Sequence, residues 1–154
     1  MSDIWGPSTW ELFHNLADKI KEDHFEKISP YLWNKILFIA NNLPCPHCKL
    51  HASRELGKVN SKTIFTKKIL IELLFRFHNL VNYKIKKNIH DISVLEKYHN
   101  IKLIRSINNF KYTWLMISKK MSLREIEKKV KHEKVVNYLI TWLLKNKHLF
   151  KDFE

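Results

Sequence analysis

Apolar side chains recur every three or four residues over most of this chain, which is the spacing of one face of an α-helix. Ser8 and Glu11 have the spacing of a capping box, so we predict that the first helix begins at Ser8. The apolar face of this helix consists of Trp10, Phe13, Ala17 and Ile20.

The next two helices are predicted from their end signals. Ser29 and Pro30 have the order of an N-cap and a first helical residue. The stripe that follows consists of Leu32, Ile36, Ile39 and Leu43. A third helix is expected from about Cys45–Pro46 to Gly57, because glycine is a natural C-cap residue.

The longest helix is predicted from about Ile64 to Lys86. Its apolar face consists of Leu70, Leu73, Leu74, Phe77 and Val81. A short helix is expected after Asp91, and the pattern from Leu103 to Ile107 is ambiguous.

A second capping box, Ser122 with Glu125, precedes the last amphipathic segment. The stripe there consists of Val135, Val136, Leu139, Ile140, Leu143 and Leu144, and together with Trp142 it must be buried somewhere. No segment alternates with a period of two for long enough to predict a strand. We therefore predict an all-α fold: a four-helix bundle (1–100) with a short fifth helix, and a helical C-terminal extension (101–154) that packs on the same domain or forms an interface.

Composition agrees with this fold. The 154 residues suit one domain, 45% of them are hydrophobic, and only 2 glycines and 4 prolines interrupt the pattern. The scarcity of turn residues argues against a sandwich or a barrel.

The net charge of +13 raises three classes of partner: nucleic acid, an anionic membrane surface, and acidic proteins or anionic cofactors. The lysines are spread along the chain, with a denser stretch from Lys111 to Lys147. Scattered lysines are typical of solvated helix faces, so we do not expect specific nucleic-acid binding.

The N-terminal region lacks the apolar core of a signal peptide, because Glu11, His14 and Asp18 interrupt it. No apolar run is long enough to span a bilayer. We therefore expect a cytoplasmic protein without a signal peptide.

The chain has only two cysteines, Cys45 and Cys48, which is not the disulfide framework of a small secreted protein. At a helix N-terminus, this spacing can close a small disulfide ring, and the helix dipole favours thiolates there. Pro46 fits the first turn because it needs no N–H partner. We expect Cys45 at the outer end, accessible to an external thiol, and Cys48 one turn further in.

Three alternatives remain open on spacing alone. The cysteines could be ordinary buried thiols. They could bind zinc together with His51, although His47 is less well oriented and a structural zinc site needs a fourth ligand. A thioredoxin-like fold is disfavoured, because the βαβ unit that it requires is not predicted.

Three segments in this order favour redox chemistry. They are WGPSTWELFH (5–14), LPCPHC (43–48) with His51-Ala52 behind it, and FHNLVN (77–82) with Lys87 after it. Their combination resembles the Erv/ALR family of FAD-linked sulfhydryl oxidases, and the compact form is most similar to the oxidases of large cytoplasmic DNA viruses. The resemblance covers roughly residues 4–100 and implies a helical bundle that binds FAD. In a virus, the location would be the host cytoplasm or the virion.

The resemblance implies roles for individual residues. Cys45 would exchange disulfides with the substrate, and Cys48 would lie next to the flavin. The cofactor-binding residues would be Gly6, Trp10, His14, Cys48, His78, Asn79, Asn82, Lys87 and Tyr98. No metal is implied. The implied reaction oxidises protein dithiols and passes electrons through the cysteine pair and the flavin to O₂, giving H₂O₂.

The implied partners are a dithiol protein substrate, with a thioredoxin-like carrier as the natural example, and a second copy of the chain in a homodimer. Many family members carry extra shuttle cysteines that this chain lacks, so its substrate must bring its own exposed dithiol to Cys45.

Spacing agrees with the implied cofactor site. His78 and Asn82 are four residues apart and share a helix face, as do Trp10 and His14. Lys84, Lys86 and Lys87 supply charge for a pyrophosphate. Taken singly, Trp10 is more typical of a core residue and His78 of a hydrogen-bonded structural histidine.

The chain departs from the family in two places. Asn88 stands where the family often has a proline, which leaves the turn after Lys87 open. Residues from about 101 onward have no counterpart in the resemblance.

Overall fold

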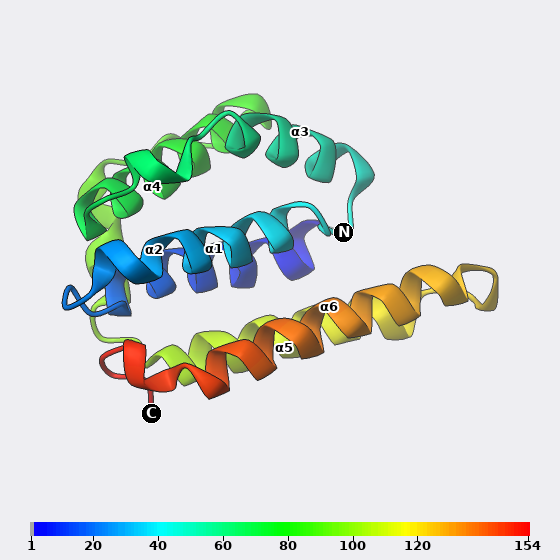
Figure 1. Cartoon of the computed structure of the whole chain (residues 1–154). Coiled ribbons are helices and arrows are strands. Elements are labelled where there is room, and N and C mark those ends of the chain that lie inside the picture. The colour runs from blue at the N-terminus through cyan, green and yellow to red at the C-terminus, as the bar shows by residue number, and fades with distance from the viewer. Residues whose placement is uncertain (1) are drawn as a thin grey trace.

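The computed structural model describes residues 2–154, and within them every regular element is helical (Figure 1). The predicted all-α class is confirmed. The α-helices are α1 (Ser2–Lys19), α2 (Phe25–Ala40), α3 (Pro46–Gly57), α4 (Lys67–Lys84), α5 (Leu103–Lys120) and α6 (Ile126–Lys145). Short 3₁₀ turns are η1 (Ser61–Thr63), η2 (Ile92–Tyr98), η3 (Leu123–Glu125) and η4 (Lys147–Leu149).

Helix α1 lies at the centre of the molecule, packed on α4 on one side and on α5 on the other (Figure 1). Every side chain from Leu12 to Ile20 is buried. The polar ones find partners inside: Asn15 Nδ2 donates to Ser106 Oγ at 2.9 Å, and Lys19 Nζ donates to the His99 carbonyl at 2.6 Å. These bonds are required because a buried polar group without a partner is costly.

Two predicted helix starts are wrong, and for the same reason. Helix α1 begins at Ser2 rather than Ser8, and α2 begins at Phe25 rather than at Ser29–Pro30. The Ser8 hydroxyl contacts Thr113 Oγ1 at 2.6 Å, and the Ser29 hydroxyl donates to the Ile64 carbonyl at 2.8 Å. These serines therefore bond to other elements, and do not cap the predicted helix ends.

Other end signals are confirmed. Helix α3 runs from Pro46 to Gly57, with Cys45 as its N-cap residue, and the Ser122–Glu125 capping box is present. Helix α4 starts later than predicted because Thr66 Oγ1 caps it by accepting from Ile69 N at 3.2 Å. It has 18 residues and is shorter than α6, which has 20.

The segment left ambiguous at Leu103 to Ile107 is the start of α5, a helix of 18 residues. No side chain caps it. Instead the C-terminal segment returns to it, so that Leu103 N donates to the Asp152 carbonyl at 2.9 Å and Ile104 N to the Phe153 carbonyl at 2.7 Å. An isolated bridge between Ile20 and Phe150 ties the same segment to the end of α1.

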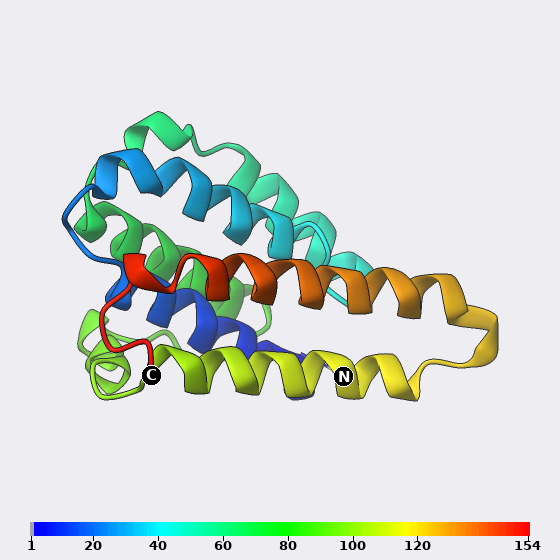
Figure 2. The same cartoon turned by 60° about the horizontal axis from the view of Figure 1, so that its bottom comes forward.

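Helix α6 packs antiparallel to α5, and the two form a long hairpin (Figure 2). Most of the predicted stripe is buried inside the chain: Val135, Val136, Leu139 and Leu143. Ile140 is half-buried and Leu144 is 48% exposed, so the buried face is narrower than predicted. Across the described residues, no helix combines the length and the apolar character that crossing a membrane requires.

The turn after α4, left open by Asn88, is a Schellman motif. Lys87 N donates to the Asn82 carbonyl at 2.8 Å and Lys86 N to the Tyr83 carbonyl at 3.2 Å. Lys86 has φ of 58°, the left-handed conformation that normally selects glycine. The motif thus ends α4 without a proline, at the expense of strain at one lysine.

We predict that Lys86→Gly stabilises the protein by about 1 kcal/mol, because relief of the left-handed strain exceeds the added entropy of the unfolded chain. Arg76→Gly, which replaces an exposed basic residue in the middle of α4, is the control and should destabilise by about 1 kcal/mol. Urea denaturation measures both. A lower free energy of unfolding for Lys86→Gly would contradict the assignment of the turn.

Candidate functional site

Cys45 and Cys48 form a disulfide at the start of α3, with their Cα atoms 5.2 Å apart. Cys48 N donates to Cys45 Sγ at 3.1 Å, so a sulfur atom caps the helix. Both cysteines are half-buried against the core, so burial does not separate an outer from an inner sulfur as we had expected. Pro46 and His47 between them are exposed.

The zinc alternative is not supported. The two sulfur atoms are bonded to each other, and the third proposed ligand, His51, packs its ring against Phe77 with centroids 6.2 Å apart. Within residues 2–154, no three histidine, cysteine or carboxylate side chains gather as a metal site would require.

A cluster of aromatic and imidazole rings lies between α1, α4 and η2. The Trp10 and His78 rings stack with centroids 3.9 Å apart and an interplanar angle of 7°. His14 stacks on Tyr98 at 5.3 Å, and His14 Nε2 lies 2.9 Å from His78 Nδ1. Four residues predicted for the cofactor site, from three separate elements, are therefore in mutual contact.

Phe77 and His51 connect this ring cluster to the helix of the disulfide. Phe77 lies 5.4 Å from Trp10 and 6.2 Å from His51, measured between ring centroids, and His51 is one turn after Cys48 on α3. From the sequence, Phe77 was predicted only as an apolar-face and motif residue, and His51 only as a motif residue and a possible zinc ligand, so neither was expected in this connection. The three-residue spacing of Cys48 and His51 was the signal for their common face.

The rings are held in their neutral forms. The pKa of His14 is lowered to about 3, mainly by burial and to a smaller extent by the neighbouring His78 and Lys97. Burial, followed by Lys97, His90 and Lys87, lowers the pKa of His78 to about 4. Burial, with a smaller effect of Glu11, raises the pKa of Tyr98 to about 12. At neutral pH one imidazole N–H is therefore shared between His14 and His78.

The other predicted residues lie around α1 and α4, and some are already engaged. The Asn79 side chain makes two hydrogen bonds to the backbone of His90, at 2.9 and 3.1 Å, which hold the loop after α4. Asn82 is buried, and Lys87 Nζ lies 3.8 Å from Asp3 Oδ1. Gly6 lies inside α1, and a Cβ added there would meet nothing within 4 Å.

Comparison with known proteins decides the family. Residues 7–102, more than half of the chain, match the model of the Erv1 / Alr family. The chain belongs to this family. The 347L protein of Invertebrate iridescent virus 6 is 31% identical over 100 residues, which cover 61% of this chain and 90% of that protein.

Two further relatives are named FAD-linked sulfhydryl oxidase, both from African swine fever virus. The protein of isolate Tick/Malawi/Lil 20-1/1983 is 32% identical over 110 residues, covering 70% of this chain and 87% of its own. The protein of isolate Pig/Kenya/KEN-50/1950 is 30% identical over 105 residues, which cover 67% of this chain and 86% of that protein. No solved structure matches the chain.

The Erv1/Alr match contains the disulfide and the ring cluster and ends at residue 102. Helices α5 and α6 follow it, although α5 packs directly on α1 of the family region. The candidate site therefore lies in the part of the chain that matches the Erv1/Alr family, and the α5–α6 hairpin lies beyond the match.

The neutral histidines predict acid sensitivity. His14 and His78 titrate near pH 3 and 4 in the folded state and near 6.5 when unfolded, so below pH 6.5 the unfolded chain binds more protons. The contribution of these two rings to stability should be constant above pH 7 and fall on acidification from pH 6.5 to pH 4. The loss is about 1.4 kcal/mol per pH unit for each fully titrating ring.

Urea unfolding at several pH values tests this. His14→Asn should make the slope of the free energy of unfolding against pH shallower by the equivalent of about one proton. His148→Asn, at an exposed position, is the control and should leave this slope unchanged. Equal slopes for the wild type and His14→Asn would show that His14 does not stay neutral in the fold.

Proposed function

We propose that this chain is an FAD-linked sulfhydryl oxidase that converts protein dithiols into disulfides through Cys45 and Cys48. The observation that carries the proposal is the disulfide at the N-terminus of α3, joined by His51 and Phe77 to a buried cluster of neutral rings. Membership of the Erv1/Alr family and relatives named FAD-linked sulfhydryl oxidase support it.

The ring cluster fits a flat cofactor with polar edges. His14 Nδ1 and His51 Nε2 are buried and have no hydrogen-bond partner. An unsatisfied buried nitrogen costs about 1–3 kcal/mol, and a hydrogen bond to a bound ligand would recover that cost. His14 belongs to the ring cluster between α1 and α4, and His51 lies between that cluster and the disulfide. This is where FAD should bind.

We assign FAD binding to the residues that the family resemblance implies. Trp10, His14, His78 and Tyr98 would hold its rings, with Gly6 and Cys48 at the flavin. Asn79 and Asn82 would act on the adenine and ribose side, and Lys87 near the phosphates. Exposed Lys84 and Lys86 add positive charge around the same end of α4. Bound FAD would accept the electron pair of the dithiol and deliver it to O₂.

The cysteine pair performs the exchange with the substrate. A substrate thiolate attacks Cys45 Sγ, the bond between the two cysteines breaks, and Cys48 leaves as a thiolate stabilised by the N-terminus of α3. The second substrate thiolate then attacks the substrate sulfur of the mixed disulfide, and Cys45 leaves. Cys48 N, which donates to Cys45 Sγ, stabilises that leaving thiolate.

The balance of the whole reaction is one dithiol and one O₂ converted to one disulfide and one H₂O₂. A small thioredoxin-like carrier with an exposed dithiol is the proposed substrate, because the chain has no cysteines beyond this pair to relay electrons. We further propose that residues 1–100 form the oxidase bundle, that residues 101–154 are its extension, and that two copies form a homodimer.

Cys45→Ser tests the proposed roles of the cysteines. We expect this variant to bind FAD and be yellow, but to lose dithiol oxidation by at least about a hundredfold, because the attacked sulfur is gone. Ser53→Ala, elsewhere on α3, is the control and should be active. Oxygen consumption with dithiothreitol and the flavin absorbance spectrum are the measurements. Normal oxidation of protein thiols by Cys45→Ser would refute the scheme.

Gly6 allows a test of the cofactor site that separates stability from binding. A Cβ at Gly6 would meet no atom beyond its chain neighbours and its own helix backbone, but Gly6 is helical and precedes Pro7, whose ring crowds the Cβ of the residue before it. This crowding offsets the roughly 1 kcal/mol by which alanine favours helix over glycine, so Gly6→Ala should change the melting temperature of the FAD-free protein little. If Gly6 lines the cofactor, the added methyl should weaken FAD binding by about tenfold, which is about 1.4 kcal/mol.

Thermal unfolding and titration with FAD, followed by quenching of flavin fluorescence, measure the two effects. Unchanged affinity in Gly6→Ala would remove Gly6 from the proposed site.

A further inference from the structure

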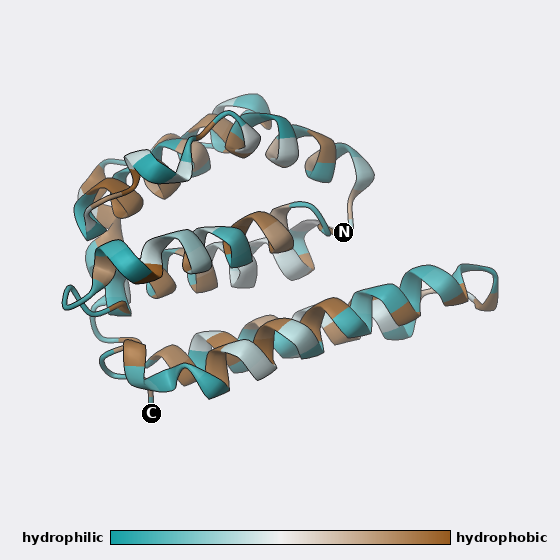
Figure 3. Ribbon diagram, viewed as in Figure 1, coloured by the Kyte–Doolittle hydropathy of each residue, from teal (hydrophilic) through white to brown (hydrophobic). Residues whose placement is uncertain are grey.

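The projecting end of the α5–α6 hairpin is strongly basic. Residues 119–134, which we call the lysine-rich tip, contain seven basic and three acidic side chains. In Figures 1 and 2 this end of the hairpin extends past the other helices, on the side where the loop between α2 and α3 lies. Most residues of the tip are hydrophilic, with a few hydrophobic positions among them (Figure 3).

The lysine-rich tip also exposes apolar side chains. Leu123 is 89% exposed, Ile126 55% and Val130 43%. A hollow of ≈ 390 Å³ is lined by Ile126, Glu127, Val130, Lys131 and Lys134. These exposed apolar side chains, gathered at one end of the hairpin with lysines beside them, are apolar surface that a partner polypeptide could cover.

Contacts between α2 and α6 place the lysine-rich tip toward the same end of the molecule as the disulfide. The Phe38 and Tyr138 rings meet at 4.9 Å, and Lys35 Nζ lies 5.3 Å from the Trp142 ring and donates to the Tyr138 hydroxyl. These pairs show that α2 and α6 run in opposite directions.

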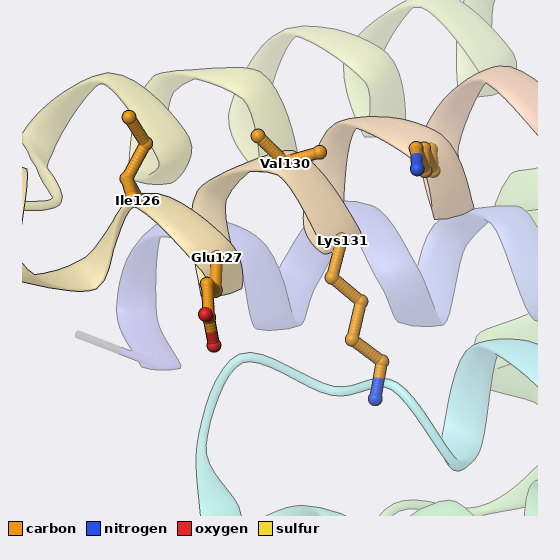
Figure 4. A pocket seen from close by; sticks show the side chains of 5 residues that line it. Ile126, Glu127, Val130 and Lys131 are labelled. Carbon is orange, nitrogen blue, oxygen red and sulfur yellow. The ribbon is translucent and has the colours of Figure 1, made fainter.

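Seven residues from Phe38 toward the C-terminus lead to Cys45, and seven from Tyr138 toward the N-terminus lead to Lys131. Both seven-residue segments extend from the Phe38–Tyr138 contact toward the same end of the molecule. Along α6 seven residues cover about 10 Å. In Figure 4, the side chain of Lys131 extends from α6 toward the loop that joins α2 to α3. The lysine-rich tip therefore stands at the end of the molecule where Cys45 exchanges disulfides.

We propose that the lysine-rich tip is the docking surface for the protein substrate, and that this substrate carries acidic residues next to the dithiol that Cys45 oxidises. The inference rests on the proposed sulfhydryl oxidase function and adds the chemical class of its substrate. Lysines beside an apolar hollow complement a segment with carboxylates and a few apolar side chains, and such complementarity steers association.

A nucleic acid is the less favoured occupant of this surface. Proteins that bind single strands without sequence preference stack bases on aromatic side chains. Residues 119–134 contain no Phe, Tyr or Trp, and the single histidine there, His132, is buried against Trp114. Exposed aliphatic side chains fit a polypeptide partner better than a nucleic acid.

The test compares two synthetic peptides that share one reduced Cys-Ala-Ala-Cys dithiol, flanked by glutamates in one and by lysines in the other. The FAD-loaded protein is assayed as the wild type and as the triple variant Lys128→Glu, Lys131→Glu, Lys134→Glu. The control triple variant, Lys27→Glu, Lys102→Glu, Lys145→Glu, makes the same change of charge at the other end of the hairpin and on α2, also at exposed positions. Dithiothreitol reports basal oxidation, and thermal unfolding confirms that each variant is folded.

We expect the wild type to oxidise the glutamate-flanked peptide with a kcat/KM about tenfold above that of the lysine-flanked one, a preference that weakens with added salt. The tip variant should lose this preference through a higher KM, while it oxidises dithiothreitol as the wild type does. The control variant should keep the preference. Binding of the glutamate peptide with serines in place of its cysteines, followed by fluorescence anisotropy, should show the same order without any turnover.

Several results would overturn the inference. One is equal oxidation of the two peptides by a wild type that is active on dithiothreitol; another is the same loss in the tip and control variants. A tip variant that is equally slow on dithiothreitol would place the lysines in the chemistry rather than in docking. Tip-dependent binding of a DNA oligonucleotide, or tip-dependent dimerisation in sedimentation, with no peptide preference, would assign the surface to another partner. A wild type inactive on dithiothreitol would refute the proposed function itself.

Discussion

Burial of α1 on all sides from Leu12 onward is the constraint on which the rest of the structure depends. A helix that is enclosed between α4 and α5 must satisfy its polar side chains within the protein. Toward α5 it does so through Ser8 with Thr113, Thr9 with the Trp114 indole, and Asn15 with Ser106. Toward α4 it presents Trp10 and His14, which form the ring cluster with His78. One helix thus joins the hairpin to the candidate site, and α5 completes the domain core.

The same enclosure explains the electrostatics of the site. Imidazoles packed among other rings, with lysines close by, lose their protons, and neutral rings can both donate and accept hydrogen bonds. Two of their nitrogens are nevertheless left without partners next to the helix that bears the disulfide. Natural cores rarely leave such atoms unsatisfied. Asn15 Oδ1, Trp33 Nε1 and His132 Nε2 are also buried without a partner, so it is the position beside the disulfide helix that distinguishes the nitrogens of His14 and His51. Polar atoms held ready inside an apolar shell suit the orientation of a flat cofactor against a reducible sulfur pair.

Features that depend on local chemistry were predictable from the sequence, and those that depend on distant partners were not. The bounds of α3 follow from Pro46 and Gly57, and the Ser122–Glu125 box is local. Ser8 and Ser29 have the sequence signature of caps, yet their hydroxyls bond to Thr113 and to the Ile64 carbonyl, which only the folded chain brings near. Family motifs grouped Trp10, His14, His78 and Tyr98 as cofactor residues, but that their rings contact one another was not predicted. The use of Asn79 to hold the His90 backbone has no signal in spacing.

The way in which α5 begins has a consequence for how the protein folds. Its first amides are satisfied by the carbonyls of Asp152 and Phe153, which lie far along the chain from α5. The opening turn of α5 can therefore be fixed only after the segment that carries these carbonyls has been synthesised and has returned to it. Contacts that join segments so distant along the polypeptide slow folding, so this closure should be one of the later steps.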